Sequence, residues 1–168
     1  MTYFELFDLP VQLKLNGPAL SKRFFELSKK YHPDYFVTGD AEVQAEALEK
    51  SALLNKAWKT FQNPDETIKY VLQLKGLLEE EEKYELPPVF LMEVLEINEQ
   101  LMEAGDDPAI KSTVETITKN LLVEIYEPVK KIVENYTEGI TTEKELLQVK
   151  EYYYKKKYLD RLNRELSA

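Results

Sequence analysis

The sequence has no cysteine and only one histidine among its 168 residues. Without cysteine, a disulfide framework, a thiolate zinc site and a cysteine nucleophile are all excluded. A single histidine cannot form a histidine-rich metal site, and neither a Ser/His/Asp grouping nor a glycine-rich phosphate loop accompanies it. We therefore find no enzyme active site in the sequence and expect no metal and no cofactor.

Long apolar runs are also lacking, because no stretch approaches the roughly 20 residues that a membrane-spanning helix needs. Residues 1–5 have neither the basic start and apolar core of a signal peptide nor an arginine-rich transit character. We therefore expect a cytoplasmic protein that does not bind membranes. The formal net charge of −9 argues against a broad nucleic-acid-binding surface, so we expect no nucleic-acid partner either.

Amphipathic helical patterns are abundant, and they predict an all-α fold. In the first half, a short apolar segment at residues 3–10 precedes a long helix that runs from about Pro18 to Tyr31. Residues 35–39 are predicted as loop, and Asp40 is a good N-cap for a second long helix. Two long helices joined by one loop form an antiparallel hairpin, which short helices at residues 3–10 and from Asn63 onward would cover.

Pro33 ends the first long helix and fixes a corner that holds His32 and Asp34. The helix before this corner carries four cations against one acid: Lys22, Arg23, Lys29 and Lys30 against Glu26. Taken alone, the cations are typical of a solvated helix face with lysines near the C-terminal dipole. A His-Pro pair at a helix end is likewise often plain turn chemistry. The function of the corner therefore depends on the wider pattern.

An aromatic opening segment, a basic helix, His-Pro-Asp and a second apolar helix follow one another in this order. The combination resembles the J-domain, the module that stimulates ATP hydrolysis by DnaK-type chaperones. The resemblance implies that residues 1–76 form a J-domain. It also implies chaperone contacts at the corner and along the basic helix: His32, Pro33, Asp34, Lys22, Arg23, Lys29 and Lys30.

Residues 77–87 are predicted to be a linker between two units. Four consecutive glutamates at 79–82 repel one another, and Pro87 and Pro88 interrupt local structure. An exposed helix end is the alternative, and it would still serve as a connector. Residues 88–168 then contain three long amphipathic helices with short turns, which predict a three-helix bundle.

Within the bundle, Pro128 is predicted to kink or interrupt the second helix, and Thr142 with Glu145 forms a capping-box signature for the last. The last helix carries a run of tyrosines at 152–154 followed by lysines at 155–157. Such a run is compatible with RNA binding or with a core or protein interface. The acidity of the whole chain favours the core or protein interface.

The predicted helix from about Pro88 to Ala104 has an unusually wide apolar band. One stripe is formed by Phe90, Val94, Ile97 and Leu101, and a second, about a third of a turn away, by Leu91, Leu95 and Met102. Beyond the second stripe lie Met92, Glu96, Glu99 and Glu103. Two interpretations remain open: the helix is buried against two neighbours, or the second stripe is exposed with an acidic rim and docks a partner protein.

Over its whole length the sequence resembles the HscB family of iron–sulfur assembly co-chaperones. Four segments carry the resemblance: Tyr3-Phe4-x-Leu6-Phe7-x-Leu9-Pro10, His32-Pro33-Asp34, Phe90-Leu91-Met92-Glu93-x-Leu95-Glu96 and Tyr158-Leu159-Asp160-Arg161-Leu162. The first and third are far more specific than His-Pro-Asp, which every J-protein shares. Phe24, Phe25 and Glu26 depart from general J-domains, where a tyrosine and cations are frequent, so the implied chaperone contact relies on the cations named above.

The resemblance implies a non-enzymatic, L-shaped co-chaperone. Its J-domain would stimulate the ATPase of an HscA- or DnaK-type chaperone, and its bundle would deliver the iron–sulfur scaffold protein IscU to that chaperone. The implied scaffold contacts are Leu91, Met92, Leu95, Glu96, Glu99, Glu103 and Tyr158. The alternative is a J-domain adaptor that presents a different client protein to a general DnaK.

Overall fold

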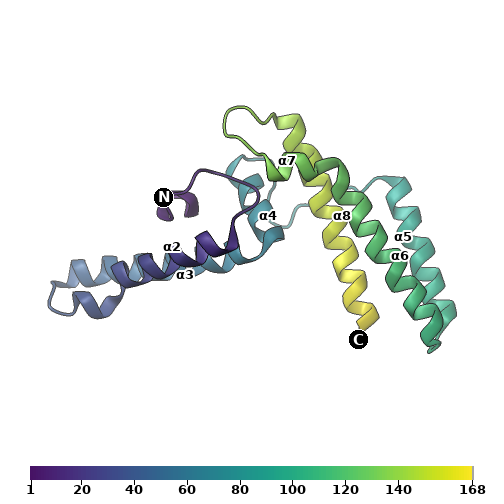
Figure 1. Cartoon of the computed structure of the whole chain (residues 1–168), viewed down its shortest axis with the longest axis horizontal. Helices are drawn as coiled ribbons and strands as arrows, with labels where there is room; N and C mark the ends of the chain where they lie inside the picture. The colour runs from purple at the N-terminus through teal and green to yellow at the C-terminus, as the bar shows by residue number, and fades with distance from the viewer. Residues whose placement is uncertain (168) are drawn as a thin grey trace.

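A computed structural model describes residues 1–167, and all regular secondary structure in this range is helical. The chain forms two arms that meet at an angle (Figure 1). The all-α class and the L-shaped combination of a hairpin with a helical bundle are thereby confirmed. The first arm contains α1 (Tyr3–Leu6), α2 (Gly17–Tyr31), the 3₁₀ helix η1 (Pro33–Phe36), α3 (Ala41–Gln62) and α4 (Pro64–Leu74).

Side-chain caps fix the ends of the helices in the first arm. Asn16 accepts a hydrogen bond from the Ala19 N–H at the start of α2, and the predicted cap Asp40 accepts one from the Val43 N–H at the start of α3. The predicted loop was wrong at its beginning, because η1 extends through Phe36. Proline at the first position of η1 and the side chain of the preceding residue stabilise this extra turn.

Aromatic packing holds the α2/α3 hairpin together. Phe24 of α2 stacks on Trp58 of α3 with ring centroids 4.3 Å apart. Further along α3, Phe61 packs against Phe4 and Phe7, which are both buried. The aromatic opening segment therefore covers the base of the hairpin, as its apolar character predicts.

The second arm contains α5 (Pro88–Ala104), α6 (Pro108–Tyr126), η2 (Glu127–Val129), α7 (Lys130–Glu134) and α8 (Glu143–Ser167). Helix α6 contacts both α5 and α8, and the three lie side by side in Figure 1. Pro128 lies within η2, so the predicted interruption with a restart is confirmed. The capping box is also present, since Thr142 and Glu145 exchange hydrogen bonds at the start of α8. Ala168, the last residue of the predicted bundle, lies outside the described residues.

The two arms share a hydrophobic core. Tyr152 and Tyr153 of α8 are buried in the same cluster as Ile68 and Val71 of α4. A second cluster, which includes Phe90, lies within the three-helix bundle. Of the interpretations of the tyrosine run, burial in a core is therefore the one that the structure supports.

Residues 77–87 are held against both arms. The carboxylate of Glu80 accepts hydrogen bonds from Lys69 at 3.1 Å and Gln73 at 2.7 Å, both on α4. On the other side, Glu82 pairs with Lys150 of α8 at 2.7 Å. The charged run therefore finds cationic partners on both sides. The boundaries 1–76, 77–87 and 88–168 stay predictions. None of the helices within residues 1–167 is long and apolar enough to cross a bilayer.

Candidate interaction surfaces

The corner at His32 joins two helices and is open to solvent. His32 has an extended backbone (φ −62°, ψ 128°), so it ends α2 and precedes η1. Its Nδ1 accepts a hydrogen bond of 3.2 Å from the Asp34 N–H and lies 3.6 Å from Oδ2 of the same residue. The imidazole is 54% exposed. Because Nδ1 is an acceptor here, the neutral ring carries its proton on Nε2, where it can donate to a partner.

The four predicted cations of α2 do not share one environment. Lys22, Lys29 and Lys30 are exposed, and the ammonium of Lys30 lies 5.2 Å from the centroid of the Tyr31 ring. Arg23 instead turns toward the body of the arm. Its Nε donates a 3.0 Å hydrogen bond to the carbonyl of Phe7, and its guanidinium contacts Glu26 at 3.3 Å. Arg23 therefore ties α2 to the opening segment, a role that the sequence did not reveal.

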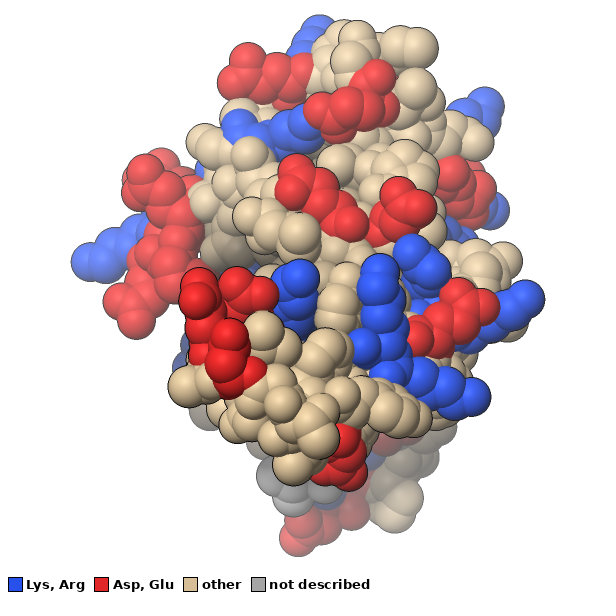
Figure 2. Space-filling view, turned by 90° about the vertical axis from the view of Figure 1, so that its left-hand side faces the viewer, with Lys and Arg blue, Asp and Glu red and all other residues tan. Residues whose placement is uncertain are grey.

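Figure 2 looks onto the free end of the hairpin and shows that its charges are unevenly distributed. Lys and Arg side chains predominate on one side of this end and Asp and Glu side chains on the other, although each side also holds charges of the opposite sign. The acids of α3 and its cap are all exposed: Asp40, Glu42, Glu46 and Glu49. A partner with a negative surface would be attracted to α2 and repelled by the first half of α3, so the distribution favours one orientation of approach.

In α5 one apolar stripe is buried and the other is exposed, as the interpretation of a partner-docking surface requires. Phe90, Val94 and Ile97 are buried in the bundle. In contrast, Leu91 is 40% exposed, Leu95 is 57% exposed and the neighbouring Met92 is 64% exposed. Burial of the second stripe between two helices of this chain is therefore excluded. We call Leu91, Met92 and Leu95 the α5 strip.

The other predicted scaffold contacts lie around the α5 strip. Glu96, Glu99 and Glu103 are exposed on the same helix. Tyr158 of α8 is also exposed, and its ring packs edge-on against that of Phe90 with centroids 6.4 Å apart. The ammonium of Lys155, which the sequence did not single out, lies 5.5 Å from the centroid of the Phe90 ring. The structure thus presents an apolar strip with carboxylates along one helix and a tyrosine from another.

Known proteins resemble this chain in sequence and in fold. A family model described as the HSCB C-terminal oligomerisation domain matches residues 86–167. Chaperone HscB from Vibrio cholerae is 28% identical, with a TM-score of 0.74 over 99% of this chain and 96% of that one. The human co-chaperone protein HscB is 27% identical, with a TM-score of 0.79 over 99% of this chain and 81% of that one. Residues 86–167 therefore belong to the HscB C-terminal family, and over its whole length the chain is similar to HscB co-chaperones.

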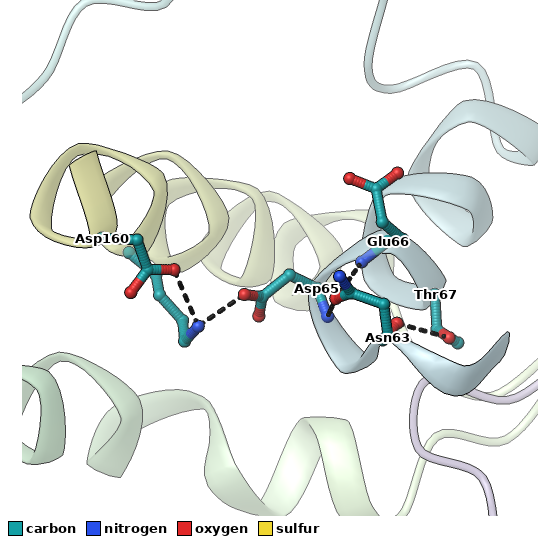
Figure 3. A network of polar contacts seen from close by, with 6 residues as sticks. Asn63, Asp65, Glu66, Thr67 and Asp160 are labelled. Carbon is teal, nitrogen blue, oxygen red and sulfur yellow. Dashed lines mark hydrogen bonds and ion pairs between the residues drawn. The ribbon is translucent and has the colours of Figure 1, made fainter. Parts of the chain in front are cut away.

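Polar contacts reinforce the junction between the first arm and the bundle (Figure 3). Lys156 of α8 bridges Asp65 at the start of α4 and Asp160 one turn further along α8. Burial lowers the pKa of Lys156, but the hydrogen bonds to the two carboxylates outweigh this effect and raise it. Asn63 accepts hydrogen bonds from the N–H groups of Asp65 and Glu66, which fixes the end of α4 that carries Asp65.

Two buried tyrosines lie beside this bridge. Burial, with a further contribution from the Asp65 carboxylate, raises the pKa of Tyr152 to about 12. Burial also raises the pKa of Tyr153 to about 12. In both cases the low-dielectric surroundings disfavour the phenolate. The junction therefore combines a close-packed aromatic core with ion pairs at its edge. It holds the arm that carries the His32 corner against the bundle that carries the α5 strip.

Proposed function

We propose that this chain is a non-enzymatic adaptor that stimulates the ATPase of an HscA- or DnaK-type chaperone and delivers the scaffold protein IscU to it. Membership of the HscB family implies the general role, a co-chaperone in iron–sulfur cluster assembly. One observation carries the specific proposal: the His32 corner and the α5 strip are both exposed, lie on different arms, and are connected through a shared core.

The proposed role of the first arm is to favour the hydrolysing conformation of the chaperone. An adaptor can do this only by binding one conformation more tightly than the other. Exposed lysines on α2 supply attraction to an acidic surface, and the imidazole and carboxylate of the corner supply directional hydrogen bonds. The acids in the first half of α3 would oppose docking of that part of the helix against the same surface.

The proposed role of the second arm is to hold the scaffold. The α5 strip offers three apolar side chains on a helix that the bundle already orders, so little conformational entropy is lost on binding. The carboxylates beside it would select a partner with cations around an apolar contact. Because the two arms are joined, a bound scaffold is presented at a high effective concentration to a chaperone bound at the corner.

The test is the chaperone's steady-state ATPase rate, measured with this chain alone, with IscU alone and with both. The proposal expects stimulation by the chain alone and a rate with both that exceeds the sum of the separate effects. Additive rates would contradict delivery of the scaffold, and an unchanged rate with the chain alone would contradict the chaperone role.

A further inference from the structure

One large apolar side chain on the basic helix is left in solvent. Phe25 of α2 is 63% exposed, whereas Leu20 and Leu27 of the same helix are buried and Phe24 is stacked on Trp58. The only ring close to Phe25 is that of Phe24, whose centroid is 5.8 Å away in an edge-on arrangement within the part of the chain that the structure describes. The hairpin core therefore does not require a phenylalanine at this position.

The position of Phe25 connects it with the His32 corner. Lys22, Phe25 and Lys29 are separated by three and four residues, so they lie in one row along α2. The corner follows three residues after Lys29, at the end of the helix. A partner that contacts the corner and both lysines must therefore also cover the ring between them.

We infer that Phe25 is a specificity-determining contact of the chaperone-binding surface, and that the chaperone it fits carries an apolar pocket bordered by acidic side chains. This inference rests on the proposed function. Because Phe25 lies in one row with the corner, the pocket that receives its ring belongs to the chaperone that binds the corner. Lys22 and Lys29 lie on either side of the ring, so acidic side chains should border that pocket. Exposed ion pairs contribute little to affinity, whereas an aromatic ring that becomes desolvated at the centre of an interface often dominates it.

The experiment measures the concentration of this chain that gives half-maximal stimulation of an HscA- or DnaK-type ATPase from the same organism. Phe25→Ala is expected to raise this concentration about tenfold or more, because a central aromatic contact is lost. Phe25→Leu should recover part of the loss. Phe25→Lys should also weaken stimulation, although it adds a cation to the basic row. Higher salt should weaken stimulation by every variant but leave the ratio between wild type and Phe25→Ala unchanged.

Leu48→Ala is the matched control, because Leu48 of α3 is 62% exposed but lies among Glu46 and Glu49 on the acidic side. It should stimulate like wild type. Circular dichroism should show unchanged helicity for every variant, since both side chains project into solvent.

Several results would overturn the inference. If Phe25→Ala stimulates like wild type while His32→Gln does not stimulate, Phe25 has no role and the proposed function stands. If Phe25→Lys stimulates at lower concentration than wild type, the surface is purely electrostatic. Phe25-dependent sedimentation with phosphatidylserine vesicles, with unchanged ATPase stimulation, would assign the ring to a membrane instead. If wild type itself fails to stimulate, the proposed function and the inference fail together.

Discussion

Lys156 on α8 donates a hydrogen bond to the carboxylate of Asp65 on α4, although the two residues are 91 positions apart in the sequence. The contact closes the polar edge of the junction between the arms, next to the buried Tyr152. Both side chains are only about one-third exposed or less, so the pair is better shielded from water than an ordinary surface ion pair.

Lys156→Met should destabilise the protein, because it leaves Asp65 without its cation while keeping most of the apolar stem. We expect a loss of about 1–2 kcal/mol in the free energy of unfolding, which for a chain of this size lowers Tm by roughly 2–8 °C. Thermal unfolding followed by circular dichroism measures the shift. Lys157→Met is the matched control, because Lys157 is the next residue of α8 and its side chain is exposed. Equal Tm values for the two variants would contradict a stabilising role for the bridge.

Stability should fall in alkaline solution because of the buried tyrosines. Their folded pKa values of about 12 exceed the ordinary value of 10.0, so stability is full below pH 10 and is lost as the pH rises toward 12. In that window each tyrosine removes at most about 1.4 kcal/mol per pH unit. The raised pKa of Lys156 acts in the same direction.

Urea unfolding at pH 8.5, 10 and 11 tests this dependence, with Tyr152→Phe/Tyr153→Phe as the comparison. The double variant should lose less stability between pH 10 and 11 than wild type does. If both proteins lose the same amount, ionisation of these two phenols does not control alkaline unfolding.

Replacing Leu91 and Leu95 together by Ala should weaken binding of IscU about tenfold or more while leaving the helical circular-dichroism signal unchanged. Both side chains are exposed in the isolated chain, so their truncation removes contact area without opening a cavity in the bundle. Isothermal titration calorimetry gives the affinity. Val123→Ala is the control, because Val123 is an exposed apolar residue of α6. A collapse of the helical signal would show instead that the two leucines belong to the core.

Local signals in the sequence predicted most of the helices and several of their ends. The N-cap at Asp40, the break at Pro128 and the capping box at Thr142 all depend on neighbouring residues, and all are present. The periodicity of α5 defined two stripes but could not decide whether the second was exposed. That answer depends on how many helices pack around α5, which is a property of the whole bundle.

Contacts between distant segments were beyond the sequence. The pairing of Glu80 with α4 and of Glu82 with α8 could not be read from the charged run itself, because the partners lie on other helices. The burial of Tyr152 and Tyr153 depends on α4, which lies some 80 residues earlier in the chain. In the sequence Arg23 is one of four cations on the same helix, and only its hydrogen bond to the Phe7 carbonyl distinguishes it from the others.

The central claim is tested most directly by the ATPase rate of the chaperone with wild type and with His32→Gln. The substitution changes an exposed corner and removes only one capping hydrogen bond, so helicity should be unchanged and IscU should bind as before. We predict that His32→Gln gives no stimulation above the basal rate at concentrations where wild type saturates. Stimulation by the variant equal to that by wild type would contradict the account.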